Sequence, residues 1–441
     1  MKMIVLREIY KPISLLLVVL TALCGCGNLY TGDETPVNAG TDDSDDNPFI
    51  YEEELPVMVA FSDPSYTVLT RGQGALDPND TENYPTKKAN AMFHIYAFRS
   101  DNPSGMTYET TRAQDTDRVI CLVDGSTGKQ GNDAEWSKHG RQACYNPASG
   151  SFISWKDEDD PLYYSTLSQI SPFNFFAYYV DDLCEGQNNY IGEKGISNFV
   201  RGVDDIRFKV SVDGSQDLMC AVASLTQDQK DNYIARLSAE EQEKVYKYYY
   251  STYTAHRNIH PVLQLKHQLA NVKFAILPTK LKNDITIESI SIKTVNKGTF
   301  IVAARDITQV GTHFSEDDEQ KELPLREADN TAFVPRLVVA GGEKVELDNS
   351  LLVPPTNNAS LIIKASVDKN GQKYYYTTVY PLKDIVKNTK DGETLEPGFL
   401  AGWRYTISIS VYGPEEIQVQ VEIDGWEDGG NIELDPDDFF E

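Results

Sequence analysis

Alternating hydrophobic and polar residues dominate this chain from residue 55 onward, and the alternation predicts strands more often than helices. The first alternating stretch begins at Leu55, after which Val57, Val59 and Phe61 recur at every second position. This spacing places the three side chains on one face of an extended strand. A turn that contains a proline and a second short alternating run then lead to residue 70.

Arg71 and Gly72 end this stretch and open onto a polar loop. Residues 72–90 are rich in Gly, Asp, Asn, Pro and Thr, a composition typical of exposed loops. The spacing alone favours an ordinary first strand that ends at a surface arginine. The alternative is a protease-sensitive joint between a strand and the domain that the strand completes.

Further strands follow in both halves of the chain. The stretch at 172–180 is almost entirely apolar or aromatic, so we expect it at the centre of a sheet. The pattern predicts strands at 91–99, 118–123, 151–155 and 172–180, and then at 262–276, 285–295, 344–347, 359–367, 374–380, 405–412 and 417–423.

One segment departs from the strand pattern. Residues 226–252 carry apolar side chains at helical spacing. Within it, Ser238 and Glu241 have the spacing of a capping box, which predicts a second helix that begins just after Leu237.

These elements predict an all-β protein with two β-sandwich domains. We expect an N-terminal domain at 55–260, with a helical insertion at 226–252 near its end, and a C-terminal domain at 261–441.

The first residues are typical of an export signal. Positive residues precede an apolar run at 13–23 that is too short to span a membrane. Leu23, Gly25 and Cys26 have the spacing of a bacterial lipobox, so we expect residues 1–25 to be removed and Cys26 to carry a lipid anchor. The alternative is a plain secretory signal. Residues 26–54 form a polar, acidic stretch in which we expect a disordered tether.

The charge of −27 argues against nucleic acid as a partner, because phosphate contacts need a basic face. A strongly acidic, self-repelling chain suits an extracellular protein. The 25 tyrosines, against 4 tryptophans, add to the strand prediction because tyrosine has a high strand propensity.

Residues with catalytic or metal-binding potential form no recognisable set. Cys121, Cys144, Cys184 and Cys220 contain no CxxC pair, and the sequence leaves open whether they form disulfides or stay as buried thiols. His256 and His260 lack a third ligand nearby, which favours a solvated pair. We therefore expect no cofactor, no metal and no enzymatic activity.

Several stretches, taken in order, resemble the fimbrillin superfamily of Bacteroidales pilus subunits. The resemblance rests on the lipobox and acidic tether, the Val-Met-Val-Ala-Phe strand, and Thr-Arg-Gly at 70–72. It continues at 93–98, 217–219, 265–274, 401–409 and Gly425-Trp426. It implies two transthyretin-like Greek-key sandwiches and export as a lipoprotein precursor anchored at the cell outer membrane, with the mature form extracellular in a fimbrium.

The resemblance also implies how such a subunit assembles. A trypsin-like protease would cut between Arg71 and Gly72, the strand at 55–71 would leave, and a strand from a neighbouring subunit would take its place. The partners implied are other pilus subunits, the processing protease and the outer membrane, with a host or bacterial surface ligand left open. The acidic tail at 427–441 contains Pro436, so its use as a donor strand stays open, as does a stalk, tip or anchor role.

Two other interpretations stay open. The first is a tethered surface lipoprotein that binds glycan, with Trp136, Trp155 and Trp403 as stacking candidates, although core packing accounts for them equally well. The second is a retained anchor subunit that keeps Cys26 and residues 27–71 in the assembled fibre.

Overall fold

The structure is a computed structural model of the chain, and the residues that it describes all belong to one compact unit, residues 49–441. It describes residues 55–62, 92–101, 120–125, 139–145, 153–155, 161–164, 169–180, 196–278, 284–327, 331–339, 341–386, 389–390, 393–394, 398–412 and 417–424. Several predictions lie outside these residues: the signal peptide 1–25, Cys26, the tether to residue 54, Arg71, Gly72, Trp136, Cys184 and the tail 427–441.

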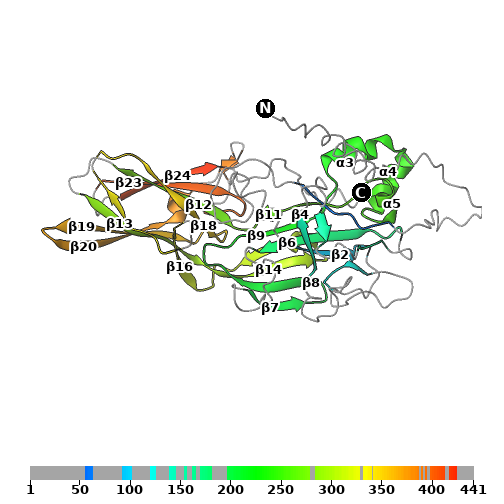
Figure 1. Ribbon diagram of the computed structural model, residues 1–441, viewed down its shortest axis with the longest axis horizontal. Helices are drawn as coiled ribbons and strands as arrows, with labels where there is room; N and C mark the ends of the chain where they lie inside the picture. The colour runs from blue at the N-terminus through cyan, green and yellow to red at the C-terminus, as the bar shows by residue number, and fades with distance from the viewer. Residues whose placement is uncertain are drawn as a thin grey trace, which may run out of the picture. The chain divides into compact units, whose positions relative to one another are not determined.

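The protein is an all-β sandwich protein, as the alternating pattern predicts. Its first large sheet has β2 (Met92–Arg99) and β6 (Phe173–Val180) at the centre, which confirms the central position expected for 172–180 (Figure 1). Both strands are buried along almost their whole length, because the sheet is covered on both faces. The order is β11-β9-β6-β2-β4-β5, with β3 beside β2; the bounds are β3 Cys121–Val123, β4 Arg141–Tyr145, β5 Ile153–Trp155, β9 Leu218–Val222 and β11 Lys266–His267.

A second sheet packs on one face of this central sheet. It has the order β15-β14-β8-β7, formed by β7 (Ile196–Arg201), β8 (Asp205–Ser211), β14 (Lys297–Ala304) and β15 (Gly311–Phe314). Tyr178 of the central sheet meets Phe208 and Phe300 of the second sheet, with ring centroids 5.6 Å and 6.2 Å away. The division at 260–261 stays a prediction, and the pairing of β14 with β8 crosses it.

Two further sheets enclose a separate core that contains Phe274, Ile290, Ile363 and Ile407. One has the order β18-β12-β23-β24, and the other has the order β16-β13-β19-β20, with β17 also beside β13. The bounds are β12 Ala270–Pro278, β13 Ile285–Val295, β16 Gln320–Pro324, β17 Arg336–Val338, β18 Val345–Val353, β19 Ser360–Lys369, β20 Gln372–Pro381, β23 Arg404–Val411 and β24 Ile417–Asp424. Short elements complete the chain: η6 Ile307–Gln309, α6 Leu382–Ile385, β21 Thr389–Lys390 and β22 Glu393–Thr394.

The prediction of a single long strand at 262–276 is wrong. The structure divides this stretch into β10 (Val262–Gln264), β11 and β12, with a bend at residues 268–269. Each piece pairs with a different neighbour, since β10 pairs with β1 (Ala60–Ser62), β11 with β9, and β12 with β18 and β23.

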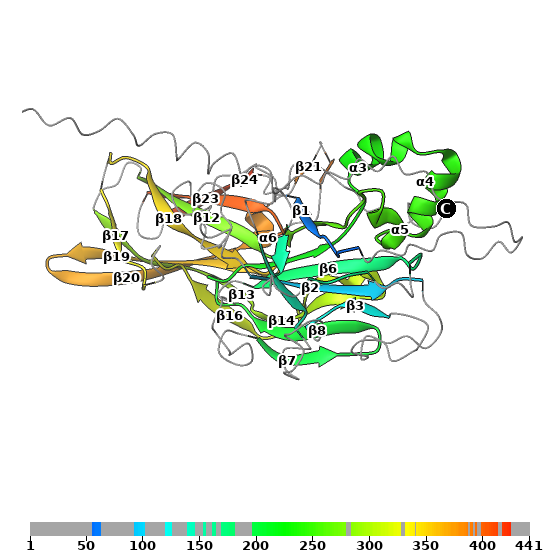
Figure 2. The ribbon, with the colours of Figure 1, turned by 45° about the vertical axis from the view of Figure 1, so that its right-hand side comes forward.

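Helices occupy the segment where the sequence breaks the strand pattern, and Figure 2 shows them grouped together. They are α3 (Gln227–Asn232), η5 (Ile234–Arg236), α4 (Ala239–Lys247) and α5 (Thr252–Ala255). The predicted capping box is present, because Glu241 N donates to Ser238 Oγ at 3.3 Å. A second capping box joins Thr226 to Gln229 at the start of α3. Among the described residues, no helix is long and apolar enough to cross a membrane.

Gly398, which precedes Phe399 of the second core, provides a test of the backbone packing there. Gly398 has φ +99°, and a Cβ there would clash with the carbonyl oxygen of Thr356. We expect Gly398→Ala to lower the free energy of unfolding by about 3 kcal/mol through left-handed strain and a backbone clash.

Gly371 is the matched control, because it has φ +80° and open space around the position of a Cβ. Gly371→Ala should cost about 1 kcal/mol, from the backbone strain alone. Urea denaturation of both variants measures the difference, and equal midpoints would contradict the close approach at Gly398.

Candidate functional site

Residues 55–62, which we call the plug strand, lie between two backbone edges. On one side, Val57 N donates a hydrogen bond to Leu162 O at 2.7 Å, and Tyr164 N donates to Leu55 O at 2.9 Å. The pairing is antiparallel, with a bridge between Pro56 and Tyr163. The first half of the plug strand is therefore held by residues 161–164.

The second half of the plug strand pairs with a different edge. Its last three residues form β1, which runs parallel to β10. Ala60 N donates to Pro261 O at 2.9 Å, immediately before β10 begins. On the opposite side, Ile153 N of β5 donates to Val59 O at 3.0 Å.

These contacts make the plug strand a closing element. Strands β5 and β11 are the two edges of the central sheet, and β10 leads directly into β11. The plug strand bonds to β5 on one side and to β10 on the other, so it links the two ends of the sheet across one face. Without the plug strand, both neighbours would lose backbone partners.

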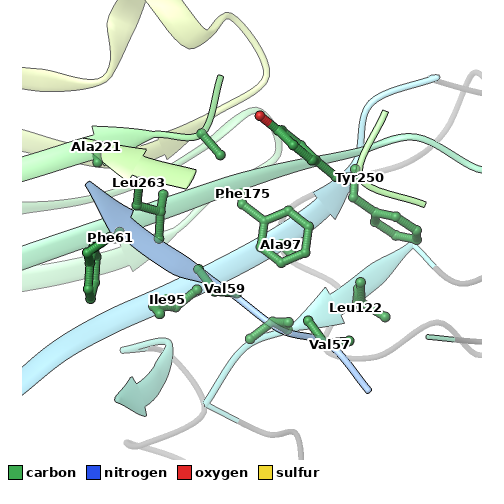
Figure 3. Close-up of a cluster of buried hydrophobic side chains, with 14 of the residues drawn as sticks. Val57, Val59, Phe61, Ile95, Ala97, Leu122, Phe175, Ala221, Tyr250 and Leu263 are labelled. Carbon is green, nitrogen blue, oxygen red and sulfur yellow. The ribbon is translucent and has the colours of Figure 1, made fainter. Parts of the chain in front are cut away.

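The side chains of the plug strand fill the core under this closure. Val57, Val59 and Phe61 are buried in the cluster of hydrophobic side chains that lies between the central sheet and the helical segment, which we call the first cluster. Their burial confirms the single apolar face predicted from their spacing. Figure 3 shows them among Ile95, Ala97, Leu122, Phe175 and Leu263 of the surrounding elements. The Phe61 ring lies 4.5 Å, centroid to centroid, from the Phe93 ring. Burial of the three side chains contributes roughly 5–9 kcal/mol.

The helices complete the wall of the same cluster. Ile234, Val245 and Tyr253 are buried in it together with the plug strand. Tyr249 ties the helices to the central sheet, because its hydroxyl donates to Ser100 Oγ at 2.7 Å and its carbonyl oxygen accepts from Phe173 N at 3.2 Å. The helical segment is therefore part of the container that holds the plug strand.

Comparison with known families now identifies the chain. Residues 88–426 match the family model described as fimbrillin-like. The chain belongs to the fimbrillin-like family. This membership makes it a structural protein of the fimbrial type and not an enzyme. The match begins after the plug strand and after Arg71, so it assigns neither of them a role.

Several solved structures are similar to this fimbrillin-like chain. A putative cell adhesion protein from Bacteroides uniformis is 12% identical, with 85% of this chain and 98% of that chain covered and a TM-score of 0.39. One from Parabacteroides distasonis is 11% identical, with 85% and 100% covered and a TM-score of 0.36. The fimbrial anchor protein Mfa2 from Porphyromonas gingivalis is 13% identical, with 77% and 90% covered and a TM-score of 0.28. No curated protein sequence matches the chain.

Two of the described cysteines of this fimbrillin-like chain, Cys121 and Cys220, are buried thiols outside any disulfide. Burial raises the pKa of Cys220 to about 12 and raises that of Cys121 well above its ordinary value. Both thiols are therefore protonated at neutral pH and poor nucleophiles. The interpretation as buried thiols therefore fits Cys121 and Cys220.

The tryptophans proposed as glycan contacts take part in packing where the structure describes them. Trp155 packs against the first cluster, and the Arg141 guanidinium carbon lies 5.3 Å from its ring centroid. Trp403 packs against the second core. Neither contact distinguishes a sugar platform from core packing, so no observation favours the glycan-binding interpretation.

The two histidines at the end of the helical segment differ from the expected solvated pair. His256 is exposed, whereas His260 is partly buried and precedes Pro261, whose carbonyl oxygen bonds to the plug strand. Burial lowers the pKa of His260 to about 4. The described residues contain no group of three or more His, Cys, Asp or Glu side chains placed to hold a metal ion.

Truncation of the aromatic side chain of the plug strand tests its seating. Phe61→Ala should lower the free energy of unfolding of the intact chain by about 3–5 kcal/mol, because it leaves a cavity beside Phe93. Pro56→Ala, at an exposed position of the same strand, should change it by about 1 kcal/mol or less. Urea denaturation followed by circular dichroism measures both, and a Phe61→Ala cost no larger than that of Pro56→Ala would contradict the seating.

The lowered pKa of His260 predicts a pH dependence. Between its ordinary value of 6.5 and the folded value of about 4, the unfolded chain binds a proton that the folded chain does not. Stability should therefore fall as the pH drops through this window, by about 3 kcal/mol from this residue.

The His260→Asn variant should lose this part of the pH dependence, as measured by urea denaturation at several pH values. His313→Asn, at an exposed position, is the control and should keep it. Identical pH profiles for wild type and His260→Asn would contradict the assignment.

Proposed function

We propose that this chain is a fimbrial subunit that is exported as a lipoprotein on Cys26 and cleaved between Arg71 and Gly72. The plug strand then leaves, and a strand from a neighbouring subunit takes its place between β10 and residues 161–164. The supporting observation is the seating of the plug strand, which is buried in the core and bonded on both sides. It is joined to β2 only through residues 63–91, which contain Arg71.

Cleavage at Arg71 would cut the chain without breaking the contacts of the plug strand. The buried side chains would still hold it by several kcal/mol, an amount close to the whole stability of many domains. The precursor is therefore protected against premature opening. A replacement strand with the same alternating side chains would restore the buried side-chain contacts and the backbone hydrogen bonds. The exchange of one strand for the other would therefore change the free energy of the subunit little.

Processing would also change the charge of the subunit. After removal of residues 1–25 the chain has 37 basic and 66 acidic residues, a net charge of −29. Residues 26–71 contain ten acidic residues and one basic residue, so their loss leaves a net charge of −20. Repulsion between two like subunits scales with the product of their charges, which this change roughly halves. Loss of the acidic segment thus favours head-to-tail contacts of the kind that build filaments.

Proteolysis of the purified chain that begins at residue 27 tests this proposal. An arginine-specific protease of trypsin type should produce a new N-terminus at Gly72, and the product should form oligomers that size-exclusion chromatography separates from the monomer. Arg71→Ala should abolish both changes, because the protease needs a basic side chain before the cut.

Two controls make the result specific to Arg71. The double variant Lys87→Ala/Lys88→Ala removes the other basic residues that precede β2, and it should be cut and should assemble like wild type. Arg71→Lys should resist an arginine-specific protease but should be cut by trypsin. The mechanism is wrong if Arg71→Ala still loses the segment and assembles normally.

A further inference from the structure

Gln229 is a buried polar residue on a mostly exposed helix. Within α3 it is the one residue described as buried. Its side chain makes two different hydrogen bonds. The Oε1 atom accepts from Thr226 N at 3.0 Å and completes the capping box, whereas Nε2 donates to the carbonyl oxygen of His260 at 2.7 Å.

The second bond connects the helix to the strand that receives the plug strand. His260 is followed by Pro261, whose carbonyl oxygen accepts from Ala60 N at 2.9 Å. Strand β10 begins at the next residue and pairs with β1. The Nε2 donor of Gln229 therefore bonds one residue away from the first backbone bond between the plug strand and its parallel neighbour.

The helical segment has its own attachments to the central sheet and to the residues that flank its strands. Tyr253 N donates to Gln169 O at 3.1 Å, and the Tyr249 contacts with Ser100 and Phe173 add two further links. None of these bonds involves the plug strand. The helices can thus remain in place when the plug strand leaves, and Gln229 can continue to hold the chain at His260.

We propose that Gln229 is a positioning residue, which holds β10 in the place where it pairs with the plug strand or with a replacement strand. The helical segment is in this account part of the strand-exchange apparatus and not a surface decoration. The positioning of β10 for a replacement strand rests on the proposed function above. The positioning of β10 for its bond with Ala60 in the intact chain is independent of that function.

The two bonds of Gln229 can be separated by substitution. Gln229→Glu keeps an oxygen that accepts from Thr226 N, as glutamate does in a capping box, but has no N–H to donate to His260 O. Gln229→Lys keeps a donor for His260 O but loses the acceptor for Thr226 N. Gln227→Glu is the control on the same helix, because Gln227 is exposed and its side chain bonds to Asp231.

Hydrogen exchange in the intact, uncleaved chain is the first measurement. Peptides covering residues 57–62 should exchange about tenfold faster in Gln229→Glu than in wild type, which is the effect of one lost buried hydrogen bond. Gln229→Lys and Gln227→Glu should stay close to wild type. Peptides from β19 in the second core should exchange equally in all four proteins, so a general loss of stability is distinguished from a local one.

Strand exchange in the cleaved protein is the second measurement. A fluorescent synthetic peptide of residues 55–71 should replace the cut segment about tenfold faster in Gln229→Glu than in wild type or Gln227→Glu. Equal protection of residues 57–62 in Gln229→Glu and Gln227→Glu would overturn the positioning role. If the cleaved wild-type protein never takes up the peptide while the protection difference persists, the proposed function fails and the positioning role stands.

Discussion

The first hydrophobic cluster of this protein is closed by one short strand. This strand lies between two backbone edges that, in the described part of the chain, are not bonded to each other. The plug strand bonds to residues 161–164 and β5 on one side and to β10 on the other. Each backbone bond contributes about 1 kcal/mol, whereas the three buried side chains together contribute several times as much. The binding free energy of the plug strand therefore comes mainly from the packing of its buried side chains. In the proposed exchange, a replacement strand would therefore need apolar side chains at the same alternating positions.

The rest of the fold limits the damage that loss of this strand would cause. The opposite face of the central sheet is covered by β7, β8, β14 and β15, whose aromatic contacts do not involve the plug strand. The second core is built on an eight-residue parallel pairing of β12 with β23 and has its own hydrophobic cluster. Removal of the plug strand opens one cluster and leaves two in place. In the proposed mechanism, loss of the strand would therefore leave these two clusters intact.

The sequence predicted best where a local pattern decides the structure. The alternation of Val57, Val59 and Phe61 indicated a buried face, the apolar run at 172–180 indicated a central strand, and Ser238 with Glu241 indicated a helix start. The sequence predicted least well those features that depend on partners distant in the chain. The stretch 262–276 alternates throughout, yet three different neighbours divide it into β10, β11 and β12. The Thr226–Gln229 box matches a capping pattern, but its bond to His260 depends on the tertiary fold.

The N-terminal residue of the protein in assembled surface fibres tests the account most directly. The account predicts Gly72, with residues 26–71 absent and the groove beside β10 occupied by a strand from another subunit. Fibres in which the chain begins at a lipidated Cys26 and retains residues 27–71 would contradict it, because the plug strand would then be a permanent part of the fold.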